Sequence, residues 1–340
     1  MPVTVLVGAL FGDEGKGKIA AYLSHLQSPS YMVRTGAINA GHTVYHNGKE
    51  YKLRALPSGL VTFRDGKGGT APGALISIEV LRREVELLGL SKEQVLVDER
   101  TGIIEDKHVE KERRDAHLAG KIGSTLTGVG AAMSDRVMRR LKLARDFKEE
   151  IERFATVVDL PELLYEAIDS YKVVHIEGTQ GYGLSLFHGT YPYVTSRDVT
   201  ASAALSEAGL SPSDASDVIL VTKAFVTRVG SGPLKGELSE EEARRRGLIE
   251  FGTVTGRMRR VAPLEENLDL LKRAARANGA TKLAVTKVDV LFPKAKGVTR
   301  WSDLPDEAKR WLFDLEKEVG VPICFVGTGP EALETVGCEA

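Results

Sequence analysis

Cysteine is scarce in this chain of 340 residues, which has only Cys324 and Cys338. One pair cannot build a disulfide scaffold, and neither cysteine has the spacing to a histidine that a metal site requires. The chain is therefore not of the disulfide-stapled secreted class. It suits a reducing compartment, and we expect a cytoplasmic protein.

An excess of charge of one sign is also absent, because 46 Lys and Arg residues face 47 Asp and Glu residues. A formal net charge of -1 gives no overall field that would attract nucleic acid or an acidic membrane. No apolar run approaches the ~18 residues of a membrane span, and residues 1–4 lack the basic segment typical of export signals. We expect no nucleic-acid or membrane partner, and infer that the ligands are small molecules.

The composition that is present, 42% hydrophobic and 27% charged residues, is typical of globular proteins. Short β-branched runs alternate with longer helical patterns, which predicts an α/β fold with a mostly parallel central sheet flanked by helices. No repeat or linker-like tract interrupts this pattern, so we expect a single domain over residues 1–340. The predicted strands cover residues 4–7, 31–34, 94–97, 172–176, 217–222, 282–286 and 321–326. The predicted helices cover residues 16–26, 78–88, 105–119, 132–144, 161–168, 264–277 and 306–317.

One short appendage interrupts this alternation. Asn47-Gly48 predicts a two-residue turn between strands at 43–46 and 50–53. The two strands would form an antiparallel hairpin attached to the main sheet.

The most informative motif follows the first predicted strand and reads Gly12-Asp13-Glu14-Gly15-Lys16-Gly17-Lys18. It has the form G-x-x-x-x-G-K, in which glycines let backbone N–H groups approach a phosphate at a helix N-terminus. Ile19 replaces the Ser or Thr that would hold Mg²⁺. Either the loop holds no nucleotide, or the metal ligand comes from elsewhere and Asp13 is the available carboxylate. A glycine turn without a ligand is the alternative interpretation.

Four further loops carry polar or glycine-rich signals. Residues 35–43 combine small residues with His42, which suits close approach to a ligand, although a lone histidine is more often structural. Residues 122–130 indicate either a second anion nest or a flexible turn. Gln180 follows a strand end, where α/β sheets place ligands, and its amide can bind a base edge. Residues 251–260 place three arginines beside a Gly/Thr turn, which suits carboxylate and phosphate.

Thr286-Lys287-Val288-Asp289 ends a late predicted strand in T-K-x-D form. The aspartate can accept hydrogen bonds from N1–H and the 2-amino group of guanine, a donor pair that adenine lacks. The lysine stem can cover the ring face. Together with the G-x-x-x-x-G-K loop, this motif predicts a P-loop-like GTP-binding fold and favours GTP over ATP.

Taken together, these motifs resemble the adenylosuccinate synthetase family, whose members join IMP and L-aspartate using GTP. The resemblance runs from Gly8 to Pro330. Within the family, the chain is similar to the compact archaeal-type forms. It is carried by Gly12 to Lys18, Asn39 to Thr43, Gln180-Gly181, His188 to Ser196, Thr227 to Gly230, Gly252 to Arg260, Thr286 to Asp289 and Thr328-Gly329-Pro330.

The resemblance implies a role for each matching position. Asp13, Lys16, His42 and Gln180 would be catalytic, with Asp13 as base and His42 as acid. Asp13 and the Gly41 carbonyl would bind Mg²⁺. GTP would contact Gly12, Asp13, Glu14, Gly15, Lys16, Gly17, Lys18, Gly41, His42, Thr43, Arg259, Lys287, Val288, Asp289, Gly327, Thr328 and Gly329. IMP would contact Asp13, Glu14, Gly15, Lys16, Asn39, Ala40, Gly41, His42, Thr125, Arg139, Gln180, Thr195 and Arg257. The aspartate substrate would contact Thr253, Val254, Thr255, Gly256, Arg257, Met258 and Arg259.

The implied reaction is the first committed step of AMP synthesis from IMP. GTP would phosphorylate the C6 oxygen of IMP, and the aspartate amine would then displace phosphate from 6-phosphoryl-IMP. A homodimer is also implied, in which Arg139, on the predicted helix 132–144, reaches the neighbour's IMP. The chain departs from the family at Thr125-Leu126-Thr127-Gly128, which lacks an arginine, and at Val254 and Met258.

The alternative function is a P-loop GTPase switch or binding protein. Such a protein needs a D-x-x-G sensor after a strand. Asp65-Gly66-Lys67-Gly68 fits by letter, but no long predicted strand precedes it, so we interpret the match as chance. A switch also leaves Asp13 unexplained, and the ligase is therefore the predicted function.

Overall fold

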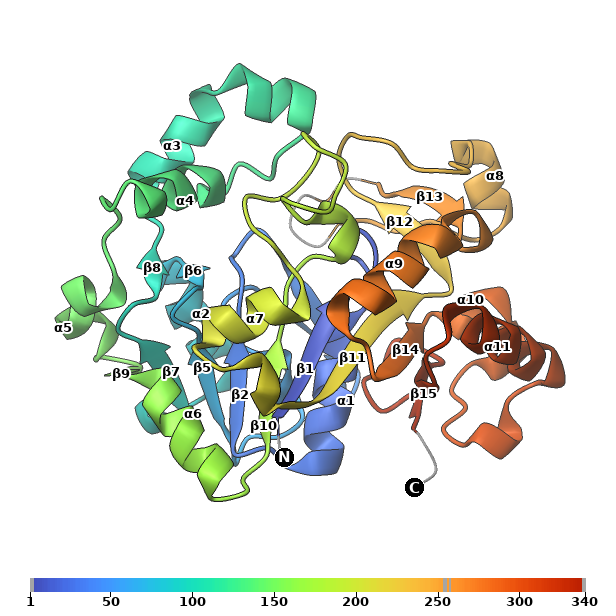
Figure 1. Ribbon diagram of the computed structural model, residues 1–340, viewed down its shortest axis with the longest axis horizontal. Helices are drawn as coiled ribbons and strands as arrows, with labels where there is room; N and C mark the ends of the chain where they lie inside the picture. Colours follow the sequence, from blue (N-terminus) through green and yellow to red (C-terminus); the bar gives the residue numbers. More distant parts are fainter. Residues whose placement is uncertain (1–2, 253–255, 257, 338–340) are drawn as a thin grey trace.

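The computed structural model describes residues 3–252, 256 and 258–337, so Cys338 lies outside the described residues. Within these residues ten strands form one sheet through the centre of the molecule, with helices around it (Figure 1). In spatial order they are β16 (Thr335–Val336), β15 (Ile323–Gly327), β14 (Lys282–Thr286), β11 (Ala215–Lys223), β1 (Val3–Gly8), β10 (Val174–Glu177), β2 (Tyr31–Arg34), β5 (Lys67–Thr70), β7 (Val95–Asp98) and β9 (Thr156–Val158). Neighbours pair in parallel except β16, which is antiparallel to β15. The predicted α/β class with a mostly parallel sheet is confirmed.

The sheet is covered on both faces, as expected for parallel strands joined by helical crossovers. All six residues of β1 are buried, and its alternate side chains enter different cores. Val5 packs in the larger core with α7 (Ala201–Ala208), whereas Leu6 packs with Ile19 and Leu23 of α1 (Lys16–Gln27). The helices are α1 (Lys16–Gln27), α2 (Ile78–Leu88), α3 (Asp106–Arg114), α4 (Val129–Val137), α5 (Lys148–Ile151), α6 (Leu160–Asp169), α7 (Ala201–Ala208), α8 (Glu240–Arg245), α9 (Leu268–Asn278), α10 (Val288–Leu291) and α11 (Asp306–Val319).

Three small antiparallel or parallel pairs accompany the main sheet. The predicted hairpin is confirmed as β3 (His42–His46) and β4 (Lys49–Leu53), and its turn residues Asn47 and Gly48 have φ of 53° and 73°. Both values are positive, as a tight two-residue hairpin turn requires. The other pairs are β12 (Phe225–Arg228) with β13 (Arg260–Pro263), and β6 (Leu75–Ile76) with β8 (Gly102–Ile103).

The structure corrects two predicted helices. The helix predicted over 105–119 ends at Arg114 and is followed by a π turn at His117–Ile122. The helix predicted over 132–144 is α4, which begins earlier, at Val129, and ends at Val137. Arg139 has φ of 60°, a left-handed conformation that ends a right-handed helix, and it therefore lies outside the helix on which it was predicted.

Of the strands in the main sheet, β5, β9 and β16 were not predicted. Strand β5 contains Gly68 and Gly69 in place of the β-branched residues that usually indicate a strand. A Cβ built at Gly68 would lie 2.3 Å from Leu60 Cδ1, so tight packing over the sheet requires glycine there. The D-x-x-G match at 65–68, which we interpreted as chance, thus enters β5 at its amino end, whereas the P-loop-like turn follows the carboxyl end of β1.

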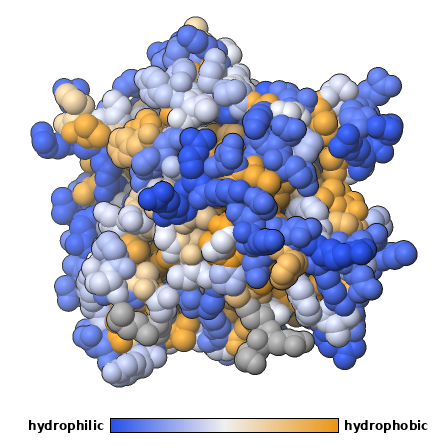
Figure 2. Space-filling model, turned by 45° about the vertical axis from the view of Figure 1, so that its right-hand side comes forward, coloured by the Kyte–Doolittle hydropathy of each residue, from blue (hydrophilic) through white to orange (hydrophobic). Residues whose placement is uncertain are grey.

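On the face shown in Figure 2 the surface is mainly hydrophilic, with apolar side chains scattered between polar ones. Such scattered apolar groups are normal for a globular protein. Among the described residues, no helix has both the length and the apolar character needed to span a bilayer.

Candidate functional site

The G-x-x-x-x-G-K segment forms a turn between β1 and α1 that is closed by its own glutamate. Glu14 Oε1 accepts hydrogen bonds from the backbone N–H of Leu10 at 2.9 Å and of Gly12 at 2.8 Å. Lys16 Nζ lies 2.8 Å from Glu14 Oε2, and both side chains are buried. Burial alone would raise the pKa of Glu14, but Lys16 and the backbone donors hold it below its usual value. Two amides and an ammonium around one anion are donors that also suit a phosphate.

The two loop lysines point to different places. The G-x-x-x-x-G-K spacing assigns the phosphate lysine to Lys18, yet Lys18 Nζ contacts the backbone carbonyl of Glu331 near the chain's C-terminal strands. Burial lowers the pKa of Lys18 to about 8. Lys16 is therefore the lysine inside the turn, and Lys18 links the start of α1 to the segment after β15.

Asp13 lies at the mouth of this turn with its side chain 16% exposed. Its Oδ2 is 3.3 Å from Thr227 Oγ1, which donates to it, and 3.3 Å from Arg259 Nε. Burial raises the pKa of Asp13, and Arg259 and Lys223 partly offset the effect. A carboxylate with a raised pKa and few hydrogen-bond donors is suited to take up a proton.

His42 at the start of β3 is fixed by a buried ion-pair cluster. Its Nδ1 contacts Glu177 Oε1, which also accepts from Arg34 Nη1 at 2.7 Å, and Ser58 N–H donates to Glu177 Oε2 at 2.6 Å. Burial would raise the pKa of Glu177, but Arg34 and His42 hold it at about 2. Burial, with Arg34, lowers the pKa of His42 to about 4, so the ring is neutral at pH 7.

The cluster also decides which nitrogen of His42 carries the proton. Nδ1 contacts both Arg34 Nη1, which can only donate, and ionised Glu177, which can only accept. Because Arg34 Nη1 already donates to Glu177 at 2.7 Å, we assign a proton to Nδ1, directed at Glu177. Nε2 is then an unprotonated acceptor, and it is buried without a hydrogen-bond partner. A buried polar atom without a partner indicates a position where a ligand group binds.

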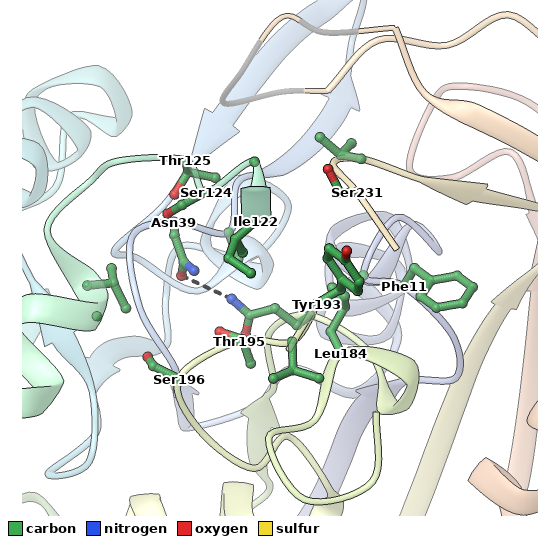
Figure 3. A pocket seen from close by; sticks show the side chains of 18 of the residues that line it. Phe11, Asn39, Ile122, Ser124, Thr125, Leu184, Tyr193, Thr195, Ser196 and Ser231 are labelled. Atoms are coloured by element: carbon green, nitrogen blue, oxygen red, sulfur yellow. Dashed lines mark hydrogen bonds between the residues drawn. The ribbon is translucent and has the colours of Figure 1, made fainter. Parts of the chain in front are cut away.

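A cavity of about 390 Å³ opens beside Asp13 and is lined by residues from several loops (Figure 3). Asn39 and Gln180 meet there, with Gln180 Nε2 donating to Asn39 Oδ1 at 3.0 Å. Thr125 and Thr195 line the same cavity and supply hydroxyl groups. These amides and hydroxyls surround a space of the size that small-molecule ligands occupy.

In the 122–130 loop, backbone N–H groups bind a carboxylate of the chain itself. The carboxylate of Glu112 on α3 accepts from Gly128 N–H at 2.7 Å and Gly130 N–H at 2.6 Å, at the N-terminus of α4. These contacts test neither of the two predicted interpretations of the loop, a nest for a bound anion or a flexible turn. The backbone donors of this loop are already bound by Glu112.

The T-K-x-D motif lies against the loop after β1. Thr286 Oγ1 donates to the Glu14 carbonyl at 2.6 Å, and a Cβ built at Gly15 would lie 3.1 Å from Thr286. Lys287 has φ of 62°, and Asp289 Oδ1 is buried without a partner. Burial also raises the pKa of Asp289. A carboxylate oxygen without a donor in this position suits a ligand that brings one.

Sequence reasoning did not assign a role to Glu250. Its carboxylate contacts three cations, Lys223, Arg259 and Lys287. Its Oε2 accepts from Lys223 Nζ at 2.7 Å and from Arg259 Nη1 at 2.6 Å, and Lys287 Nζ lies 3.4 Å from Oε1. Burial would raise the pKa of Glu250, but Lys223, Lys287 and Arg259 hold it well below its usual range. The sequence offered one signal that Glu177 and Lys223 belong to the site, because each is a charged residue at the end of a strand whose last residues are buried.

Some predicted site residues are not brought into this site. Arg139 is exposed beyond the end of α4, next to exposed Val137 and Met138, and is not among the residues that line the cavity. Met258 forms a β-bridge with Phe251, and Gly256 N–H donates to the carbonyl of Gly252 at 2.8 Å. Thr253, Val254, Thr255 and Arg257 lie outside the described residues.

Comparisons with known proteins agree on one family. A family model described as adenylosuccinate synthetase matches residues 5–152 and 140–295. A curated adenylosuccinate synthetase from Pyrococcus sp. (strain ST700) is 46% identical over 334 residues, which cover 97% of each chain. One from Methanocaldococcus jannaschii is 45% identical over 336 residues, covering 98% of this chain and 96% of the relative.

Two solved structures share the fold. The fully ligated adenylosuccinate synthetase from Plasmodium falciparum is 24% identical, with a TM-score of 0.88 and 100% of both chains covered. A cyanophage S-2L succinoaminodeoxyadenylate synthetase bound to dGMP and dATP is also 24% identical, with a TM-score of 0.81 and coverage of 100% of this chain and 96% of the other.

Proposed function

Because the chain belongs to the adenylosuccinate synthetase family, GTP-dependent ligases of purine biosynthesis that join IMP and L-aspartate, we propose the roles that its own residues play in that reaction. The observation that supports these roles best is the place of Asp13. It lies between a turn rich in phosphate-type donors and a cavity lined by amide and hydroxyl groups. A base in that position can act on a purine in the cavity while a phosphate occupies the turn.

Asp13 takes the N1 proton of IMP, which makes the C6 oxygen nucleophilic. That oxygen attacks the γ-phosphorus of GTP, GDP leaves, and 6-phosphoryl-IMP is formed. The aspartate amine then bonds to C6, the C6–O bond breaks, and inorganic phosphate departs with the oxygen. Lys16 balances the negative charge at the phosphates, once a phosphate has displaced the Glu14 carboxylate from it.

Mg²⁺ fits the oxygen donors that this site offers. Asp13 provides a partly exposed carboxylate, and the Gly41 carbonyl belongs to a residue that lines the same cavity. Across the described ranges, no group of three His, Cys, Asp or Glu side chains could hold a metal by itself. Asp13 and Gly41 would therefore hold the ion together with phosphate oxygens, as is usual for magnesium. When bound, the ion supplies charge stabilisation at the transferring phosphoryl group.

His42 can act as an acid only after it gains a proton at Nε2, since Glu177 accepts the proton on Nδ1. The negative charge of a bound triphosphate beside Nε2 favours that protonation. The protonated ring then donates towards the departing β-phosphate. Gln180 and Asn39 orient the base of IMP through their amides.

Asp289 reads the guanine base, because its unpartnered Oδ1 can accept from N1–H or the 2-amino group. Lys287 covers the ring face. We assign the remaining GTP contacts to the turn from Gly12 to Lys18, to residues 41–43, to Arg259 and to residues 327–329, and the aspartate contacts to residues 253–259.

We also propose a cytoplasmic homodimer in which Arg139 completes the IMP site of the neighbouring subunit. Two observations support this proposal. Arg139 is exposed and away from its own cavity, and Val137 and Met138 beside it are 69% and 56% exposed. Exposed apolar groups around a cation suit a two-fold interface.

The test is an assay of adenylosuccinate and phosphate with IMP, L-aspartate, GTP and Mg²⁺, omitting one component at a time. We expect both products only when all components are present. Phosphate release from GTP alone would contradict the ligase and favour the switch. The switch has no structural support from its D-x-x-G match, which lies at the amino end of β5, away from the turn after β1.

A further inference from the structure

Glu250 is a buried carboxylate with no part in the roles proposed above. Its side chain is 12% exposed and contacts three cations: Lys223, Arg259 and Lys287. These cations come from the end of β11, from the residue before β13, and from the residue before α10. One carboxylate therefore joins segments that are far apart in the sequence at the edge of the site.

Two of these cations face both Glu250 and the base. Arg259 places Nη1 2.6 Å from Glu250 Oε2 and Nε 3.3 Å from Asp13 Oδ2. Lys223 Nζ lies 2.7 Å from Glu250 Oε2 and donates to Thr227 Oγ1 at 2.6 Å, and Thr227 donates to Asp13. Lys223 is buried, so it requires a negative partner close by. Without the charge of Glu250, Asp13 is the carboxylate towards which both cations can turn.

We propose that Glu250 is a positioning residue that holds Arg259 and Lys223 away from full pairing with Asp13 and anchors Lys287 beside the guanine-reading aspartate. This inference rests on the proposed function and assigns Glu250 to the same site. Glu250 would thereby keep Asp13 available for IMP and keep Arg259 and Lys287 in place for GTP. Its removal should change both the rate and the affinity for GTP.

The backbone contacts around residue 250 should persist in a Glu250→Gln variant. The backbone N–H of Arg259 donates to the Glu250 carbonyl at 2.8 Å, and Phe251 bridges Met258. Neither contact needs the side chain of Glu250. A glutamine of the same length removes the charge and replaces one acceptor oxygen by a donor, so it weakens the ion pairs without shortening the side chain.

The test compares steady-state kinetics of wild type, Glu250→Gln and a matched control, Glu237→Gln. Glu237 pairs with Arg260, the residue after Arg259, but is 38% exposed and has no contact with Asp13 among the described residues. For Glu250→Gln we expect kcat to fall at least tenfold and KM for GTP to rise at least fivefold, with KM for IMP changed less than threefold. Glu237→Gln should match wild type.

A merely structural role would lower thermal stability or the active fraction and leave both KM values unchanged, which would overturn the inference. So would a Glu250→Gln enzyme with kcat within threefold and KM for GTP within twofold of wild type. If Glu250→Gln does not fold, Glu250→Asp replaces it. That shorter carboxylate should raise KM for GTP at least twofold, and wild-type kinetics would contradict the proposal. A wild type that makes no adenylosuccinate would instead refute the proposed function.

Discussion

The individual carboxylates of this site have different roles because their neighbouring charges and hydrogen-bond donors differ. Glu14, Glu177 and Glu250 each contact cations or several hydrogen-bond donors, which hold their pKa values below the usual range. Asp13 and Asp289 have fewer donors, and burial raises their pKa values. The first group therefore acts as fixed negative charge. The second group is free to receive a proton or a base edge from a ligand.

At Asp13 the account predicts loss of catalysis without loss of structure. Asp13→Asn keeps the size of the side chain, but the amide cannot take the N1 proton or replace an anionic metal ligand. Loss of a base commonly costs about 10² to 10⁴-fold in rate. Turnover measured under saturating IMP, GTP and L-aspartate should fall by that amount. Turnover within tenfold of wild type would show that another group is the base.

At Asp289 the account predicts a change of nucleotide preference. Asp289→Asn replaces an acceptor with an amide that can also donate, which suits the 2-oxo group of xanthosine triphosphate. The ratio of kcat/KM for the two nucleotides should move from GTP towards xanthosine triphosphate. An unchanged ratio would mean that Asp289 does not read the base.

Among the elements, those with β-branched strands or strong helical periodicity could be predicted from sequence. Strands β1, β2, β11 and β14 lie where the pattern placed them. Strand β5 was missed because glycines fill it for packing reasons, and the end of α4 was missed because Arg139 adopts a left-handed conformation. Local patterns do not report such tertiary requirements.

The site, like the fold, could be predicted from the sequence only in part. Motifs located the turn at Gly12 to Lys18, the T-K-x-D strand and Gln180, because phosphate and base recognition impose particular residue types. The partners were not predictable, since Glu177 meets His42 and Glu250 meets Lys223 only once distant segments fold together. The G-x-x-x-x-G-K spacing alone does not distinguish the two lysines of the loop. The family resemblance implied Lys16 as the catalytic lysine, and the structure shows that Lys18 contacts the carbonyl of Glu331.

His175 on strand β10 makes the free energy of unfolding depend on pH in the acid range. His175 is buried between Ser24 and Gln27 of α1, and burial lowers its pKa to about 4. The unfolded chain binds that proton near pH 6.5, so the folded state has its full stability above pH 6.5 and loses it as pH falls towards 4. At pH 5 the loss from His175 should be about 2 kcal/mol.

Urea unfolding at pH 7.5 and pH 5 tests this on His175→Gln, which keeps hydrogen-bonding capacity. The variant should lose less free energy of unfolding between the two pH values than wild type, by about that amount. His25→Gln, on the exposed side of α1, is the matched control and should behave as wild type. Equal pH dependence in wild type and His175→Gln would contradict the assignment.

For the whole molecule, the ten-stranded sheet includes both the first and the last strands of the described residues, while its organisation as one domain remains a prediction. The parallel strands place the turn after β1, the segment after β10 and the motif after β14 at one edge of the sheet. Convergence of loops at the carboxyl edge is the usual way in which α/β folds build a site.

The proposed dimer can be tested by mixing two inactive variants. Asp13→Asn lacks the base and Arg139→Leu lacks the proposed phosphate contact, so each homodimer should be nearly inactive. After random subunit exchange about half the dimers are mixed and one of their two sites is intact, which predicts about a quarter of wild-type activity. If mass measurement shows exchange and activity does not recover, Arg139 does not serve the neighbouring site.

In the proposed reaction, the C6 oxygen of IMP is phosphorylated before the aspartate amine displaces the resulting phosphate. The most direct measurement uses IMP labelled with ¹⁸O at C6, together with GTP, Mg²⁺ and L-aspartate, and follows the label by mass spectrometry. We predict that the label appears in inorganic phosphate, with one labelled oxygen for each adenylosuccinate formed. Unlabelled phosphate, with the ¹⁸O released to water, would contradict the account.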